Sequence, residues 1–329
     1  MHPHRLTTGS RADVIPDNMR MNRFLAAVAV VMMTLSCTEK NAFTVTSVSL
    51  GSHSGNYIAV IPANGEVDSY MVLIPGFGEA AESVMDNTDL PAEAARAGIA
   101  VFIATLQDGV ESYSFSAESQ ECLRGIVGDI RSRFDLEQAD YCIGGFSMGG
   151  SAAVRYAELV TDNHPSCVFA IDSPLDYERY RYSTERDVNV YRKGMDDSIY
   201  IQLLEDITPL VKDSPYLLSD ETHSTIIPLK NMPVRYYIEP AEQWWLDNRR
   251  TDVLGLNILD ATAFINDLRL IGNDRAELIV TSGRGYRNHG QTYHPHSWTI
   301  ADTADLIGWI LRCHDDKGAS HEGGSIPSR

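Results

Sequence analysis

Short apolar runs alternate with amphipathic stretches along most of the chain. Apolar runs closed by glycine, proline or polar residues are typical of buried strands, and such runs occur at 70–74, 99–105, 140–143, 167–171, 234–238 and 276–281. Alanine-rich segments and apolar side chains three and four positions apart indicate helices, at 90–98, 119–134, 151–159, 260–270 and 302–313. Because strands and helices alternate, the pattern predicts an α/β fold, with a mostly parallel sheet covered by helices on both faces.

Three segments fall outside this alternation. Residues 41–61 alternate between apolar and polar, which favours antiparallel strands at the start of the fold. Residues 173–232, between the fourth and fifth predicted strands, are too long for a plain crossover, so we expect a helical insertion there that serves as a lid. The polar, glycine- and serine-rich end of the chain predicts a loose tail, which leaves 37–314 as a single domain and 315–329 as the tail.

The N-terminus has the pattern of an export signal. Arg23 precedes the apolar run "FLAAVAVVMMTL" at 24–35, which is short for a membrane span but suits the apolar core of a signal peptide. Ser36-Cys37 after this run resembles a lipobox, the motif at which bacterial lipoproteins are cleaved and acylated on cysteine. An ordinary secretory signal and an N-terminal anchor helix are the alternatives.

The lipobox resemblance implies that residues 1–36 are upstream sequence and signal peptide, and that the mature protein begins at a lipid-bearing Cys37. Thr38 stands where an aspartate would signal retention in the inner membrane. The resemblance therefore implies an exported lipoprotein of the outer membrane, on its periplasmic or surface face. Contact with the membrane would then rest on this N-terminal anchor alone.

Composition narrows the classes of partner. With 329 residues, of which 43% are hydrophobic, the chain can bury a sizeable core. Its formal net charge of -18 argues against nucleic acid as a partner, because a phosphate backbone needs a basic surface, and against electrostatic docking onto anionic lipid. The simplest interpretation of the acidity is solubility, and the oligomeric state stays open.

Cysteine spacing gives no sign of a metal site. Apart from Cys37, the cysteines are widely separated and form no CxxC pair, so we expect no zinc site. These cysteines are Cys122, Cys142, Cys167 and Cys313. Export would permit disulfides, but their pairing cannot be deduced from spacing.

The stretch "YCIGGFSMGGSAA", residues 141–153, surrounds one serine with glycines between a predicted strand and a predicted helix. Gly145 and Gly149 stand two positions before and two positions after Ser147. A sharp strand-to-helix turn would strain the serine backbone, and side chains at the flanking positions would collide across it. The pattern therefore predicts a serine hydroxyl held above the carboxyl edge of the sheet, at the N-terminus of the next helix.

With this motif in its strand–turn–helix context, the chain resembles an α/β-hydrolase over residues 41–314. The resemblance implies a nucleophile, Ser147, that acts with an acid and a histidine in the chain order Ser, acid, His. It also implies an oxyanion hole of two backbone amides, here those of Met148 and of Phe77, in "IPGFGE" after the first predicted strand. No cofactor is implied.

The histidine of the triad is expected after the last predicted strand. The segment "YRNHGQTYHPHSW" there contains His289, His294 and His296. His296 is our choice because it lies just before the final helix and because His-Ser-Trp resembles the family's loop; His294 is the alternative. His294 and His296 could share one side of an extended segment and bind zinc, but no acidic cluster accompanies them.

The acid is expected after the fifth predicted strand, where "YYIEPAEQWWLDNRR" offers Glu239, Glu242 and Asp247. Ala241 stands where an aspartate would be expected, so the resemblance places the acid at Glu242 or Glu239, since glutamate is an accepted variant. Asp172, after the fourth predicted strand, is a third option because some lipases place the acid there.

The resemblance implies a serine hydrolase that forms an acyl-enzyme on Ser147 and cleaves an ester, as a carboxylesterase or a carbohydrate-ester deacylase. The tyrosine-rich, charged sequence of the expected lid favours a small polar or glycan-linked ester over a long fatty acyl chain. Two alternatives stay open. One is a serine peptidase of the same fold, and the other is a catalytically silent relative that serves as a surface binding lipoprotein.

Overall fold

The computed structural model describes residues 42–51, 54–107, 109, 112–190, 198–287 and 290–322. The predicted signal peptide, the predicted lipidation site Cys37 and His289 lie outside the described residues. None of the described helices is long and apolar enough to cross a membrane.

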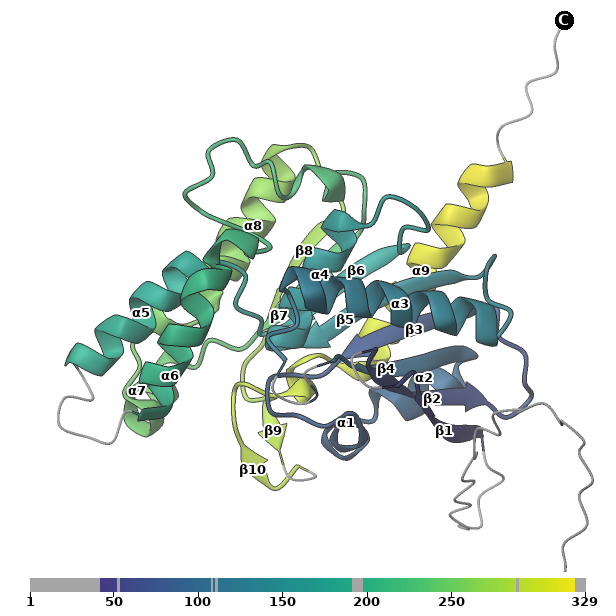
Figure 1. Ribbon diagram of the computed structural model, residues 1–329, viewed down its shortest axis with the longest axis horizontal. Helices are drawn as coiled ribbons and strands as arrows, with labels where there is room; N and C mark the ends of the chain where they lie inside the picture. Colours follow the sequence, from purple (N-terminus) through teal and green to yellow (C-terminus); the bar gives the residue numbers. More distant parts are fainter. Residues whose placement is uncertain are drawn as a thin grey trace, which may run out of the picture. The chain divides into compact units, whose positions relative to one another are not determined.

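A single eight-stranded sheet runs through the described body, in the order β1-β2-β4-β3-β5-β6-β7-β8 (Figure 1). β2 runs antiparallel to its neighbours β1 and β4, and the other pairs are parallel. The strands are β1 (Phe43–Ser49), β2 (Asn56–Pro62), β3 (Ser69–Ile74), β4 (Ile99–Thr105), β5 (Asp140–Phe146), β6 (Cys167–Ile171), β7 (Val234–Ile238) and β8 (Ala276–Val280). The predicted α/β fold with a mostly parallel sheet is confirmed.

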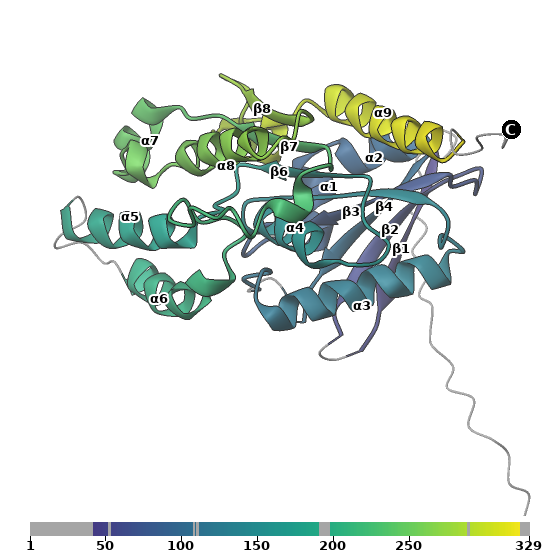
Figure 2. The same cartoon turned by 90° about the horizontal axis from the view of Figure 1, so that it is seen from above.

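Helices cover both faces of this sheet (Figure 2). They are α1 (Ala81–Asn87), α2 (Leu90–Arg96), α3 (Ala117–Arg133), α4 (Met148–Leu159), α5 (Tyr177–Val190), α6 (Ser198–Ile207), α7 (Glu242–Arg249), α8 (Ile258–Leu270) and α9 (Thr303–Glu322). α3, α4 and α8 pack on one face, and α1, α2 and α9 pack on the other. Successive side chains of a strand point to opposite faces, so β3 sends Tyr70 and Val72 into the first layer and Met71 and Leu73 into the second.

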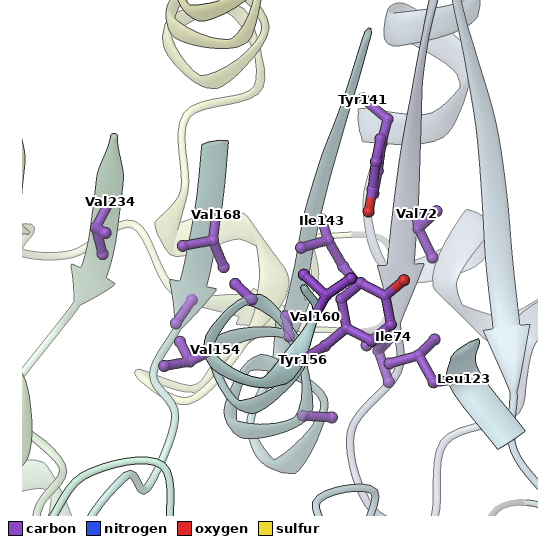
Figure 3. Packing of buried hydrophobic residues seen from close by; sticks show 14 of the residues in the cluster. Val72, Ile74, Leu123, Tyr141, Ile143, Val154, Tyr156, Val160, Val168 and Val234 are labelled. Atoms are coloured by element: carbon purple, nitrogen blue, oxygen red, sulfur yellow. The ribbon is translucent and has the colours of Figure 1, made fainter. Parts of the chain in front are cut away.

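The layer under α4 fixes the position of that helix. Val154 and Tyr156 of α4 lie over Ile143 of β5 and Val168 of β6 (Figure 3), and all four side chains are buried. Burial of large apolar side chains is the main stabilising contribution in such a core. The N-terminus of α4 is thereby held at the carboxyl end of β5, where the serine motif lies.

The segment between β6 and β7 holds α5, α6 and two short 3₁₀ helices, Thr208–Asp213 and Ile227–Leu229, which confirms the helical insertion. Two strands of two residues each, β9 (Tyr286–Arg287) and β10 (Thr292–Tyr293), follow β8 and pair antiparallel with each other. At the C-terminus α9 continues to Glu322, so helix occupies the first part of the stretch that we expected to be a loose tail. Residues 323–329 lie outside the described range.

Candidate active site

Ser147 occupies the turn between β5 and α4 with a backbone that L-residues rarely adopt. Its φ is 54° and its ψ is -129°, a strained combination for a residue with a side chain. Its amide donates to the Ile171 carbonyl at the end of β6 (2.9 Å), and its own carbonyl accepts from the Gly150 amide (3.0 Å). The serine therefore lies at the carboxyl edge of the sheet, directly before α4, as the motif predicts.

The glycines beside Ser147 are required by close backbone contacts. A Cβ on Gly145 would lie 2.5 Å from both the Gly149 carbonyl carbon and the Ile74 oxygen. A Cβ on Gly149 would lie 2.0 Å from that same Ile74 oxygen. The collision across the turn that the sequence predicts is therefore present in the structure, and β3 takes part in it as well.

His296 and Asp172 meet next to this turn. The Nδ1 atom of His296 lies 2.7 Å from Oδ2 of Asp172, whose side chain is buried. Ser147, Asp172 and His296 line one cleft. The ring of Phe146 packs on the His296 imidazole with 4.4 Å between centroids, which restricts the orientation of the imidazole.

Glu239 and Glu242, the first choices for the acid, make other contacts. The oxygens of Glu239 accept from the amides of Gly283 and Arg284 (both 2.9 Å) and from the Tyr293 hydroxyl (2.7 Å). Glu239 therefore braces the loop that follows β8. Glu242 is exposed in the first turn of α7. The carboxylate contact that we expected from one of these glutamates is made by Asp172, the third option.

Strand order gives the physical reason for this difference. Asp172 follows β6, which pairs directly with the strand that carries Ser147. Glu239 follows β7, which is one strand further from Ser147. Neighbouring parallel strands are about 4.8 Å apart. The backbone of Glu239 therefore lies about one strand spacing further from the Ser147 turn than the backbone of Asp172 does.

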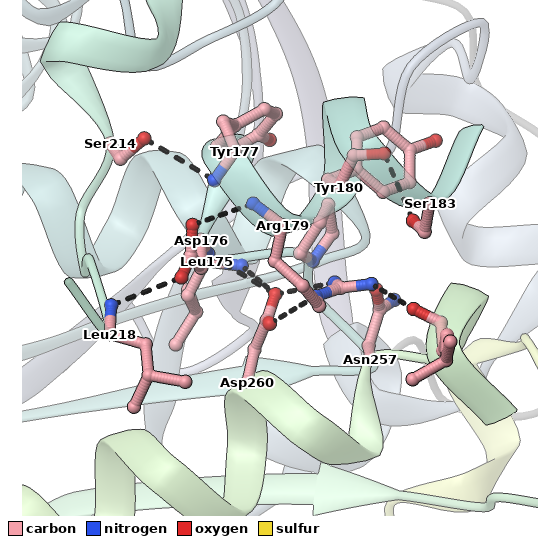
Figure 4. A network of polar contacts seen from close by, with 12 residues as sticks. Leu175, Asp176, Tyr177, Arg179, Tyr180, Ser183, Ser214, Leu218, Asn257 and Asp260 are labelled. Carbon is pink, nitrogen blue, oxygen red and sulfur yellow. Dashed lines mark hydrogen bonds and ion pairs between the residues drawn. The ribbon is translucent and has the colours of Figure 1, made fainter. Parts of the chain in front are cut away.

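A second side chain holds the Asp172 carboxylate in place. Nδ2 of Asn257 donates to Oδ1 and to the carbonyl oxygen of Asp172, each at 3.0 Å. Oδ1 of Asn257 accepts from Arg179 at 3.4 Å, and Arg179 forms a bidentate ion pair with Asp260 (Figure 4). This network ties the start of the helical insertion to α8 and leaves Oδ2 of Asp172 directed to His296.

The two amides expected to form an oxyanion hole belong to Met148, which follows the serine, and to Phe77, in a turn that adjoins the serine. A Cβ on Gly76 would lie 3.2 Å from Cβ of Ser147, so the Gly76-Phe77 turn packs closely against the serine. Oε2 of Glu79 accepts from the Gly76 amide at 3.1 Å and fixes this turn. Met148 begins α4, where amides have no partner within the helix. No hydrogen bond among the described residues uses the amide of Phe77 or of Met148.

His294, the alternative histidine, has a different environment. Its ring lies 4.6 Å from that of Trp244, and its Nδ1 accepts from the His296 amide at 3.2 Å. Burial, together with the charge of Arg287, lowers the pKa of His294 to about 3, so the ring is neutral at ordinary pH. Of the two histidines, His296 is the one that is hydrogen-bonded to a carboxylate.

Two clefts meet at Ser147 and His296. The first, of about 320 Å³, extends toward the insertion and α7 and includes Tyr180, Trp245 and Arg249. The second, of about 340 Å³, extends along the Gly76-Phe77 turn. Arg287 lines both clefts. Within the described part of the chain, no group of three or more histidine, cysteine or acidic side chains could hold a metal ion.

Asn257 and Arg287 were not anticipated from the sequence. Asn257 stands just before α8, and Arg287 belongs to the short β9 strand; neither position carries a motif. The signal for Asp172 was present, because an acid directly after a buried strand is the same feature that pointed to Glu239.

No family model and no curated protein sequence matches the chain. Among solved structures it is similar to the Pyrococcus furiosus esterase Pf2001 (14% identity, 86% of this chain and 95% of that chain, TM-score 0.52). It is also similar to a variant of Saccharomyces cerevisiae monoglyceride lipase in complex with a substrate analog (13%, 85% and 99%, 0.54) and to S-formylglutathione hydrolase from Staphylococcus aureus (16%, 82% and 99%, 0.52). At these identities the likeness concerns the fold, and together with the strand order it shows that the chain has the α/β-hydrolase fold.

Proposed function

We propose that the protein is a serine hydrolase that cleaves an ester through Ser147, His296 and Asp172. The observation that carries this proposal is a strained serine that shares a cleft with a histidine whose ring is hydrogen-bonded to a buried carboxylate. The similar structures named above include an esterase and a lipase, which supports an ester as the bond that is broken.

In the proposed reaction the Ser147 hydroxyl attacks the ester carbonyl carbon, and His296 takes the hydroxyl proton. Asp172 accepts the hydrogen bond from Nδ1–H of His296 and stabilises the imidazolium that forms. The amides of Phe77 and Met148 donate to the oxyanion of the tetrahedral intermediate. His296 then gives its proton to the leaving alcohol, which leaves an acyl group on Ser147.

Deacylation repeats these steps with water. His296 takes a proton from the water molecule, which attacks the acyl carbonyl carbon, and the same amides stabilise the second oxyanion. The bond to Ser147 breaks and the serine recovers its proton from His296. His296 therefore serves as acid and base in both half-reactions, while the nucleophile is Ser147 in the first and water in the second. The substrate class we propose is a small polar or glycan-linked ester.

Turnover of a substrate panel tests the proposal. Acetylated sugars, short 4-nitrophenyl esters and dipeptide amides are compared with wild-type protein and with Ser147→Ala. We expect ester hydrolysis by the wild type and its loss in Ser147→Ala. Cleavage of the amides alone would favour a peptidase, and wild type that turns over no substrate would favour a silent binding protein.

We also propose that the protein is exported and anchored by a lipid on Cys37. The basis is the apolar run at 24–35 followed by Ser36-Cys37. We expect palmitate incorporation in a bacterial host and its loss in Cys37→Ser, with the variant no longer in the membrane fraction. Equal labelling of the two proteins would overturn this proposal.

A further inference from the structure

Arg287 presents a guanidinium group at the junction of the two clefts. Its Nε and Nη2 atoms donate to the carbonyl oxygen of His296, with a distance of 2.9 Å for Nε. No carboxylate among the described residues forms an ion pair with Arg287, and no hydrogen bond to its Nη1 is present there. The chain therefore places a half-buried positive charge beside Ser147 and leaves part of its donor set unused.

The acids that face the first cleft already have partners. Asp172 binds His296 and Asn257, as described above. Glu239 accepts from the loop after β8. Asp187 lies 3.9 Å from a guanidinium nitrogen of Arg186. None of these carboxylates is in a position that neutralises Arg287 by a direct ion pair.

A second cation lines the same cleft. Burial and the charge of Arg249 lower the pKa of the Arg287 guanidinium, while Glu79 and Asp172 act in the opposite direction. The two like charges oppose each other in a partly desolvated space, where Coulomb energies exceed those in water. An anion bound in this cleft would relieve this repulsion, and a planar guanidinium fork is well suited to bind carboxylate oxygens.

We propose that the substrate ester carries a carboxylate close to its scissile bond and that Arg287, with Arg249 beside it, binds this group. The inference rests on the proposed hydrolase function. A singly charged carboxylate fits the site better than a phosphate dianion because Asp172, Asp187 and Glu239 line the same cleft and would repel a second negative charge.

Two matched substrate pairs test the inference without assuming which side of the ester carries the charge. One pair is 4-nitrophenyl hexanoate and mono(4-nitrophenyl) adipate, which differ by a carboxylate on the acyl side. The other is methyl 4-acetoxybenzoate and 4-acetoxybenzoate, which differ on the leaving-group side. Each kcat/KM is normalised to the rate of hydroxide-catalysed hydrolysis of the same ester.

We expect the wild type to prefer the anionic member of at least one pair by roughly tenfold or more, the effect typical of one charge-assisted hydrogen bond. Arg287→Gln should lose this preference, and Arg287→Lys, which keeps the charge without the fork, should retain part of it. Arg284→Gln is the matched control, since the Arg284 side chain pairs with Asp302 and lines neither cleft; it should keep the full preference.

The outcomes separate the two levels of the proposal. Turnover of both members with no anionic preference in the wild type, or a preference that survives in Arg287→Gln, would overturn the carboxylate inference and leave the hydrolase proposal intact. Equal losses on both members in Arg287→Gln would assign Arg287 to support of the His296 loop instead. Absence of turnover of every ester by the wild type would overturn the hydrolase proposal itself.

Discussion

Asp172 reaches His296 because its backbone turns sharply at the end of β6. Its φ is 44°, and its amide donates to the Tyr237 carbonyl at 2.9 Å. The next residue is also fixed, since the Ser173 amide donates to the Tyr236 hydroxyl at 2.7 Å. At the residue scale, β6 and β7 together hold one strained aspartate whose carboxylate faces the imidazole.

Substitution of Asp172 should show whether it is the acid of the proposed triad. We expect Asp172→Asn to lower kcat by about 10³- to 10⁴-fold, because the imidazole loses the carboxylate that fixes its tautomer and stabilises its charged form. Glu242→Gln is the control, since Glu242 is exposed, and it should keep near-normal kcat on 4-nitrophenyl acetate. A large loss in Glu242→Gln with normal turnover in Asp172→Asn would reverse the assignment.

Asn257 should act through Asp172 as a positioning residue. Removal of its two hydrogen bonds to Asp172 in Asn257→Ala frees the carboxylate to rotate, and we expect kcat to fall roughly tenfold with little change in KM. Asn248→Ala removes an exposed asparagine that bonds only within its own helix and should leave kcat unchanged. A wild-type kcat in Asn257→Ala would remove Asn257 from the proposed site.

The serine and its turn could be predicted from the sequence, whereas the acid could not be selected. The serine turn is encoded locally, by glycines at fixed offsets from Ser147. The choice among Asp172, Glu239 and Glu242 depends on which strand lies next to β5 and on which backbone turns toward the imidazole. Those are non-local features, and only the three-dimensional arrangement reveals them.

At the element scale, β3, β5 and α4 pack closely where they meet at the serine turn. We expect Gly149→Ala to lower the free energy of unfolding by about 1–3 kcal/mol, because the added Cβ meets the backbone of β3 and not a movable side chain. Urea unfolding followed by circular dichroism measures this change.

Gly128 provides a matched control within α3. A Cβ there has no neighbour within 4 Å, and the residue is exposed. Gly128→Ala should therefore raise the free energy of unfolding by roughly 0.5–1 kcal/mol, since alanine restricts the unfolded chain more than glycine does. Destabilisation by Gly128→Ala equal to that by Gly149→Ala would argue against a special restriction at the serine turn.

Helices and strands could be predicted from the sequence where their burial gives a recognisable pattern of apolar residues. The central strands read as continuous apolar runs because both of their faces are covered. α7 escaped prediction because none of its residues is buried, so it has no apolar stripe. β9 and β10 are too short to show a period of two. α7 and β9 contribute residues to the clefts, where side chains are exposed and are not packed in the core.

For the molecule as a whole, stability in acid should depend on His294. Its folded pKa of about 3 lies below the ordinary value of 6.5, so between these values the unfolded chain binds the proton more readily. Stability therefore falls as the pH falls through this window. Between pH 7 and pH 4 we expect the wild type to lose roughly 2–3 kcal/mol more than His294→Gln does, as measured by urea unfolding at each pH. Identical losses would mean that His294 titrates normally.

At this scale the sequence indicated one α/β body with a mostly parallel sheet, a helical insertion and a net charge of -18. The mostly parallel sheet and the insertion were found as expected. It gave no indication of the positive charges of Arg249 and Arg287 in the cleft, because they come from separate elements that the fold brings together. The net charge describes the average over all residues, whereas the charge in the cleft depends on the few residues that line it.

Reaction with a fluorophosphonate probe, followed by intact-mass and peptide mass spectrometry, tests the proposed triad most directly. We predict one adduct per chain, located on Ser147, absent from Ser147→Ala and formed far more slowly in His296→Ala and Asp172→Asn. A wild type that stays unmodified, or an adduct that forms at the same rate in Ser147→Ala, would contradict the assignment of Ser147 as an activated nucleophile.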